Sequence, residues 1–247
     1  MGFQTVFKRY ELKYLLTPRQ KEKVLGAMQP YMALDQYGRT TIRNLYYDTD
    51  TYLLVRRSIE KPAYKEKIRV RSYSRTDRDS AAFVELKKKY KSVVYKRRIS
   101  LPYAEATAWL SREKHPDKHT QIANEIDYFL DYYGSLHPTV FLSYEREAYY
   151  ANDGSDFRVT FDDNILCRQN ELSLESEVYG TPILPGGKVL MEIKCSGGIP
   201  LWMTHVLSEE KIYKTSFSKY GTAYGMLIFP QTHPTNSYHM LEVATNA

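Results

Sequence analysis

The chain has 247 residues, and 43% of them are apolar, enough to bury a sizeable core in one large domain. Lys and Arg number 35 against 29 Asp and Glu, a mild excess that favours anionic partners, but its spread over many segments disfavours a nucleic-acid binder. The two cysteines match no metal or disulfide spacing, and no run reaches the roughly 18 apolar residues of a membrane span. We therefore expect a cytoplasmic protein without membrane insertion.

Several segments alternate apolar and polar residues with a period of two, which is typical of half-buried strands. The expected strands are 5–16, 39–48, 64–75, 81–90, 92–101, 139–151, 156–164 and 187–196. The expected helices are 18–29, 50–58, 103–112, 118–133, 200–210 and 219–228, and the first is capped by Thr17 with Pro18 at its first position. We expect a long loop at 168–185, and a tail at 233–247 after a single domain spanning 1–232.

Each expected strand carries one charged face and one apolar face, because successive side chains point to opposite sides. In 64–75, Lys67, Arg69 and Arg71 share a face, while Ile68 and Val70 take the other. The same alternation gives polar faces that contain Glu11 and Lys13; Glu85 and Lys87; Tyr144 and Arg146; Arg158, Thr160 and Asp162; and Glu192 and Lys194.

These polar faces admit two interpretations. An ordinary sheet has one solvated face, and pairs such as Glu11 with Lys13 would then be surface ion pairs. However, Lys and Arg dominate these faces, and single carboxylates are placed among them. We therefore predict an α+β fold, in which about eight antiparallel strands form a barrel or tunnel with a polar basic lumen and helices pack outside.

The positive charge of a basic lumen must be balanced by negative charge, since buried cations repel each other and lose hydration. Carboxylates and an anionic ligand can both supply it. Arg matches phosphate oxygens with two parallel hydrogen bonds, and Lys acts as a point charge, so a triphosphate is a suitable ligand. A hard divalent cation can be held by one or two carboxylates together with the phosphates, and the candidate metal ligands are Glu192, Glu85 and Glu11.

The sequence resembles the VTC domain, the polyphosphate polymerase domain of the triphosphate tunnel metalloenzyme (CYTH-like) superfamily, over roughly residues 5–230. The resemblance rests on the order and spacing of FKRYELKY at 7–14, NLYYDT at 44–49, KIRVRSY at 67–73, VELKKK at 84–89, SYEREAY at 143–149, RVTFDD at 158–163, LMEIKCSG at 190–197 and SFSKYGTAYG at 216–225.

The resemblance implies that polyphosphate is formed from the γ-phosphate of ATP or another nucleoside triphosphate, assisted by Mn²⁺ or Mg²⁺. It implies catalytic roles for Lys219, Arg146, Arg69 and Arg71, and it makes Glu192 a metal ligand. The phosphate-binding set that we predict from the resemblance and the strand faces is Lys13, Lys67, Lys87, Arg158, Lys194 and the lumen hydroxyl of Tyr144.

Two positions depart from the family pattern. The wider superfamily often begins with Glu-x-Glu-x-Lys, but here Arg9 precedes Glu11 and Lys13, which removes a metal ligand and favours polyphosphate over simple hydrolysis. Ser216 stands where the eukaryotic members carry a Lys that contacts phosphate. A triphosphatase or nucleotide cyclase of the same fold, and a non-catalytic polyphosphate-binding module, remain open as alternatives. The sequence does not predict an oligomeric state.

Overall fold

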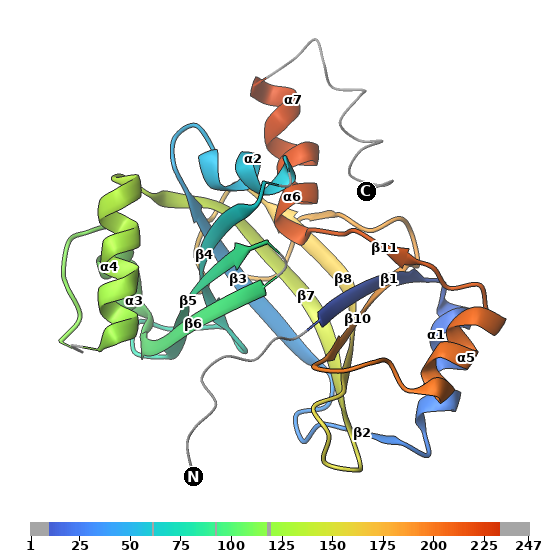
Figure 1. Ribbon diagram of the computed structural model, residues 1–247. Coiled ribbons are helices and arrows are strands. Elements are labelled where there is room, and N and C mark those ends of the chain that lie inside the picture. The colour runs from blue at the N-terminus through green and yellow to red at the C-terminus, as the bar shows by residue number, and fades with distance from the viewer. Residues whose placement is uncertain (1–9, 61, 92, 118–119, 233–247) are drawn as a thin grey trace.

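One antiparallel sheet organises the fold (Figure 1). The computed structural model describes residues 10–60, 62–91, 93–117 and 120–232, so the predicted tail at 233–247 and the first residues of the predicted strand 5–16 lie outside the described residues. The strands are β1 (Tyr10–Leu16), β2 (Met32–Leu34), β3 (Thr40–Asp48), β4 (Tyr64–Ser72), β5 (Ala81–Tyr90), β6 (Val93–Pro102), β7 (His137–Ala151), β8 (Arg158–Arg168), β9 (Thr181–Pro182), β10 (Val189–Cys195) and β11 (Lys214–Thr215).

Helices lie between the strands largely where the sequence predicts them. They are α1 (Pro18–Met28), α2 (Leu53–Ile59), α3 (Tyr103–Leu110), α4 (Gln121–Tyr133), α5 (Leu201–Glu209), α6 (Lys219–Ala223), the π-helical turn η1 (Tyr224–Ile228) and α7 (Phe229–Thr232). The predicted cap of α1 is present, because Thr17 Oγ1 accepts from the Gln20 amide at 3.2 Å and Gln20 Oε1 accepts from the Thr17 amide at 2.9 Å. The described residues contain no helix with the length and apolar character that crossing a bilayer requires.

The sheet curls around an interior and leaves its edges apart. Its strand order is β11-β1-β10-β8-β7-β3-β4-β5-β6, with β2 beside β7 and β9 beside β8. Within the described residues, the ladder does not close between β6 and β11, and β11 is only two residues long. An ion pair at 3.5 Å between Lys87 on β5 and Glu11 on β1 nevertheless spans the interior. The predicted α+β tunnel is therefore confirmed, in the form of a curled sheet whose hydrogen bonding stays open.

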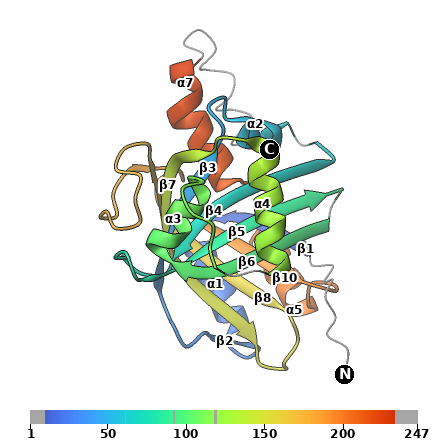
Figure 2. The same ribbon diagram turned by 90° about the vertical axis from the view of Figure 1, so that its left-hand side faces the viewer.

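Helices cover the outer, apolar faces of the strands (Figures 1 and 2). On one side α3 and α4 pack on β4, β5 and β6 through buried residues such as Trp109, Phe129 and Leu86. On the other side α1 and α5 pack on β1, β8 and β10. The last helices and α2 close one end of the interior through a third apolar cluster that includes Tyr220. Because the apolar faces of the strands lie on the outside, under the helices, their charged faces point into the interior.

Candidate polyanion-binding site

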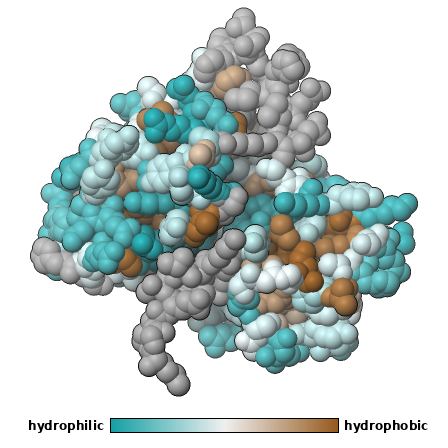
Figure 3. All heavy atoms as spheres, in the orientation of Figure 1, coloured by the Kyte–Doolittle hydropathy of each residue, from teal (hydrophilic) through white to brown (hydrophobic). Residues whose placement is uncertain are grey.

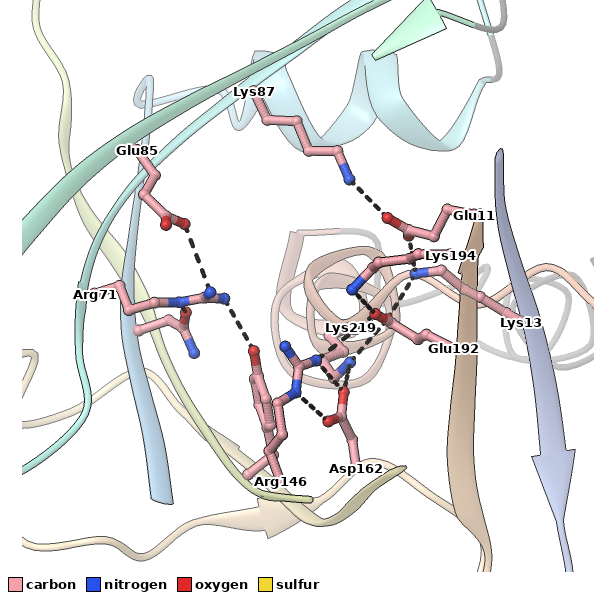
Figure 4. A network of polar contacts seen from close by, with 12 residues as sticks. Glu11, Lys13, Arg71, Glu85, Lys87, Arg146, Asp162, Glu192, Lys194 and Lys219 are labelled. Carbon is pink, nitrogen blue, oxygen red and sulfur yellow. Dashed lines mark hydrogen bonds and ion pairs between the residues drawn. The ribbon is translucent and has the colours of Figure 1, made fainter. Parts of the chain in front are cut away.

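The buried carboxylate of Asp162 joins three elements inside the curled sheet (Figure 4). Arg146 on β7 donates to Asp162 on β8 through two parallel hydrogen bonds, of 2.6 Å from Nε and 2.7 Å from Nη2. Lys219 Nζ, from the start of α6, lies 2.5 Å from the second carboxylate oxygen. Burial alone would raise the pKa of Asp162, but Arg146 and Lys219 more than offset this and hold it below its usual value.

A second carboxylate, Glu192 on β10, forms ion pairs with several cations. Its oxygens lie 3.1 Å from Lys13 Nζ, 3.1 Å from Lys194 Nζ, 3.3 Å from Lys219 Nζ and 3.6 Å from Arg146 Nη2. Burial would raise the pKa of Glu192, and the surrounding cations instead lower it well below its usual range. Glu192 is therefore an ionised carboxylate in the middle of the predicted phosphate-binding residues.

Glu11 extends this network to the opposite wall. Lys13 Nζ lies 2.9 Å from one Glu11 oxygen, and Lys87 Nζ lies 3.5 Å from the other. Burial would raise the pKa of Glu11, and the ammonium groups of Lys87 and Lys13 lower it. The side chain of Lys87 is 44% exposed, so this residue lies at the accessible border of the network.

Glu85 on β5 is the centre of a separate basic cluster. Arg69 donates to it from Nε at 2.9 Å and from Nη2 at 2.7 Å, and Lys96 Nζ lies 2.7 Å away. Arg71 and Arg98 are more distant, at 3.8 Å and 3.7 Å. Burial lowers the pKa of Lys96 to about 8, although Glu85 acts in the opposite direction. More cations surround Glu85 than its single negative charge can neutralise, and the same is true of Asp162 and Glu192.

Tyr144 lies between these clusters. Its hydroxyl accepts from Arg71 Nη2 at 2.9 Å, and its ring lies 4.6 Å from Lys219 Nζ and 5.0 Å from the Arg146 guanidinium carbon. Burial would raise the pKa of this phenol, but the charges of Arg146, Arg71 and Lys219 lower it to about 8. The hydroxyl thus shares its surroundings with three residues for which the sequence predicts catalytic roles.

Lys67 differs from the other basic residues. Its ammonium donates to Ser218 Oγ at 3.0 Å and lies 5.9 Å from the centre of the Tyr220 ring. In the described part of the chain it forms no ion pair with a carboxylate. Burial, followed by the charges of Lys87 and Lys65, lowers its pKa to about 7. Lys67 is thus a basic group without a carboxylate partner among the described residues, and an anionic ligand would favour its charged form.

Arg158 shares the inner face of β8 with Thr160 and Asp162 but has a different partner. Its guanidinium lies 4.1 Å over the ring of Tyr150 and donates to the Tyr150 hydroxyl. Among the contacts of the described residues, none joins it to Asp162 or Glu192. The structure thus brings together most of the predicted site residues and leaves Arg158 beside them.

Some inner residues received no predicted role. They are Asp162, Lys96, Arg98, Asn44, which accepts from Arg71 Nε at 2.9 Å, and Tyr46, whose hydroxyl accepts from Arg69 at 2.8 Å. The alternation places Asp162 on the polar face of its strand, and this feature of the sequence could have indicated that Asp162 lies in the site. The run Lys96–Arg98 has bases on both faces, and Arg97 turns outward to Glu125 on α4 at 2.8 Å.

The carboxylates are not arranged as a protein cage for a metal. Across residues 10–60, 62–91, 93–117 and 120–232, no three His, Cys, Asp or Glu side chains form a cluster that could hold one. Glu11 and Glu192 share Lys13, whereas Glu85 belongs to the cluster with Arg69. Mg²⁺ and similar hard cations commonly take only one or two protein carboxylates and complete their shell with phosphate and water. Glu192 and Glu11 fit that kind of site.

Apolar and polar surfaces separate on the outside of the molecule (Figure 3). Hydrophilic side chains gather over β5, β6 and the neighbouring helices, whereas apolar ones gather over α5 at the lower right. A broad surface hollow there is lined by Leu201, Trp202 and parts of α1. This hollow lies away from the inner charges, and we place the candidate site inside the sheet because the chemistry is concentrated there.

The fold of the chain is thus a curled antiparallel sheet with inward-facing cations and helices on its outside. The chain belongs to the VTC domain family, whose model matches residues 8–228. It shares its fold with a Bacillus halodurans protein provisionally described as an adenylate cyclase, with 13% identity, a TM-score of 0.52, and coverage of 86% of this chain and 94% of that one.

A Vibrio parahaemolyticus protein with the same provisional description has 11% identity and a TM-score of 0.47, with coverage of 89% of this chain and 98% of that one. At 13% identity the likeness to the Bacillus protein concerns the fold alone. No curated protein matches the sequence at a significant level.

Proposed function

We propose that the chain binds ATP and polyphosphate in its basic interior and transfers the γ-phosphoryl group of ATP to the end of a growing polyphosphate. The observation that supports this most strongly is the convergence of Arg146, Lys219, Lys13 and Lys194, from four different elements, on Asp162 and Glu192. Such an excess of buried cations is stabilised by a ligand with many anionic oxygens.

The proposed reaction needs positioning and charge neutralisation. A terminal oxygen of the polyphosphate attacks the γ-phosphorus, the bond from this phosphorus to the β,γ-bridging oxygen breaks, and ADP leaves. Arg146 and Lys219 would hold the transferred phosphoryl group, and Arg69 and Arg71 would hold the rest of the chain of phosphates. The hydroxyl of Tyr144, between both groups of cations, would orient a phosphate oxygen.

A divalent cation, Mn²⁺ or Mg²⁺, belongs to this proposal. Glu192 and Glu11 would hold it together with phosphate oxygens, and it would neutralise charge that develops during transfer. Glu85 would act differently, by orienting Arg69 and Lys96. The proposed location is the cytoplasm, where ATP is available.

The purified chain, ATP and Mn²⁺ provide the test. We expect phosphate polymer and ADP, and we expect Lys219→Met and Glu192→Gln to form at least about a hundredfold less polymer, as for lost transition-state contacts. Lys114→Met, a change at an exposed surface lysine, should retain the wild-type rate.

Other products would select other functions. Free phosphate without polymer would indicate a triphosphatase, and a cyclic nucleotide would indicate a cyclase. Salt-sensitive polyphosphate binding without turnover would indicate a binding module. Polymer formed equally well by the wild type and both site variants would contradict the assignment of Lys219 and Glu192.

A further inference from the structure

The hydroxyl of Thr160 is buried without a hydrogen-bond partner in the described part of the chain. The side chain of Thr160 is 3% exposed. Buried hydroxyls are nearly always hydrogen-bonded, since an unpaired one loses its contacts with water and gains nothing in exchange. The unpaired hydroxyl of Thr160 therefore needs an explanation.

Thr160 lies on the inner face of β8. Its chain neighbours Val159 and Phe161 belong to the outer apolar cluster under α1 and α5, so Thr160 projects to the other side. Asp162, two residues further on, shares this face and contacts Arg146 and Lys219. Thr160 is thus part of the inner wall on which the cations converge.

The neighbours of Thr160 across the sheet explain why it finds no partner. Glu192 lies directly opposite on β10, and Ala148 lies opposite on β7. The carboxylate of Glu192 already interacts with Lys13, Lys194 and Lys219, and Ala148 has no polar group. Of the two residues directly opposite Thr160, one thus has no polar side chain and the other is engaged by lysines, and the hydroxyl makes no hydrogen bond within the described residues.

A valine would have nearly the same shape at this position and would need no partner. Valine is also the residue that precedes Thr160 on the strand, so β structure does not require a hydroxyl. An unsatisfied buried hydroxyl lowers the stability of the ligand-free protein relative to such an apolar replacement. A group that costs stability without a partner in the free protein is a candidate for contact with a ligand.

We propose that Thr160 Oγ1 donates a hydrogen bond to a phosphoryl oxygen of the bound triphosphate or polyphosphate, beside the contacts of Arg146 and Lys194. This assignment rests on the proposed function. It gives Thr160 a role that depends on the ligand: the hydroxyl is unsatisfied in the free protein and becomes satisfied on binding.

Thr160→Val and Thr160→Ser test the assignment with tripolyphosphate as the probe, in calorimetric titrations with EDTA and with Mg²⁺. We expect Thr160→Val to bind about tenfold more weakly in both conditions, the effect of one lost hydrogen bond to a charged partner. Thr160→Ser should stay within about threefold of the wild type, because it keeps the hydroxyl.

The melting temperature of the free protein separates a ligand contact from a structural one. Thr160→Val should melt at the wild-type temperature or above it. The control is Thr139→Val, since Thr139 is also buried in a strand but donates to the Tyr46 carbonyl at 3.1 Å, and this variant should melt lower.

Three outcomes would overturn the assignment to a phosphoryl oxygen. They are wild-type affinity in Thr160→Val, a melting temperature lowered as far as in Thr139→Val, and an affinity loss confined to Mg²⁺, which would point to the cation instead. Failure of the wild type to bind tripolyphosphate would instead reject the proposed function itself, and the two failures are therefore distinguishable.

Discussion

The ammonium of Lys219 lies 2.5 Å from Oδ2 of Asp162, although the two residues are 57 positions apart in the chain. Lys219 begins α6, and Asp162 is fully buried in β8. Asp162 also holds the Arg146 guanidinium with two hydrogen bonds. One carboxylate thus fixes two cations relative to each other, which is the kind of rigid support that a phosphate-binding site needs.

Asp162→Asn should lower the free energy of unfolding by about 3 kcal/mol at pH 7, because it leaves two buried cations without their shared anion. Urea denaturation measures this. Asp163→Asn is the matched control: Asp163 pairs with Arg39, whose side chain is 46% exposed, and its loss should cost less than about 1 kcal/mol. Equal losses in both variants would contradict the support role of Asp162.

Lys67 should make polyphosphate binding sensitive to pH near neutrality. Its pKa is lowered to about 7 by burial and by neighbouring cations such as Lys87, and a bound polyanion favours the charged form. We expect tripolyphosphate affinity to fall as the pH rises from 6 to 8, with proton uptake on binding at pH 8. Titrations in two buffers with different ionisation heats measure this uptake, which Lys67→Met should remove and Lys114→Met should not.

The titration of Lys67 should also make the stability of the ligand-free protein depend on pH. The pKa of Lys67 is about 7 when folded and about 10.4 when unfolded. Between these values the unfolded chain binds more protons, so the contribution of Lys67 becomes less destabilising as the pH rises. The stability difference between Lys67→Met and the wild type should therefore shrink from pH 7 to pH 10. A constant difference would show that Lys67 keeps its charge throughout this range.

The period-two pattern predicted much of the interior because strand geometry is local. On β4, Arg69 and Arg71 share a face with Lys67, and the structure turns that face inward as the sequence analysis expected. The apolar alternates Ile68 and Val70 are fully buried under α3 and α4. The very short strands β2, β9 and β11 went unpredicted, because two or three residues show no periodicity.

Contacts between distant elements could not be predicted in this way. The pairing of Asp162 with Lys219 depends on how α6 closes the end of the sheet, and no spacing in the sequence encodes that distance. Lys96 and Arg98 are ambiguous for another reason. The run includes Arg97, and a strand with bases on both faces does not reveal which face is inside until the packing of α4 on Arg97 is known.

Tyr144 should add a second inflection to the pH dependence of binding. Its pKa is lowered to about 8 by Arg146, Arg71 and Lys219 against the effect of burial, so a phenolate forms above pH 8 and repels phosphate. Tripolyphosphate affinity should fall again between pH 8 and 9 in the wild type and fall less in Tyr144→Phe, where Lys96 still loses its charge in this range. Tyr149→Phe, on the outer face of the same strand, should keep the full wild-type fall. A fall in Tyr144→Phe as large as in the wild type would assign the inflection to other groups such as Lys96.

The hydroxyl of Tyr220 connects the helix that carries Lys219 to the sheet. It donates to Asp48 Oδ2 at 2.9 Å and lies 2.9 Å from Thr139 Oγ1. Asp48, at the end of β3, also accepts from the amides of Leu54 and Val55 in α2. Burial raises the pKa of Asp48, and its hydrogen bonds act against this rise. Tyr220 therefore ties α6 to both α2 and β3.

Tyr220→Phe should lower the free energy of unfolding by about 1–3 kcal/mol, since it leaves the buried carboxylate of Asp48 with one donor fewer and removes the hydroxyl that contacts Thr139 Oγ1. It should also weaken tripolyphosphate binding severalfold, because Lys219 directly precedes Tyr220 and loses its fixed position. Urea denaturation and calorimetric titration measure the two effects. Tyr224→Phe, at a neighbouring ring packed against Tyr52 and Phe229, is the control and should keep wild-type binding. Lost stability with unchanged affinity in Tyr220→Phe would mean that Lys219 is positioned by Asp162 alone.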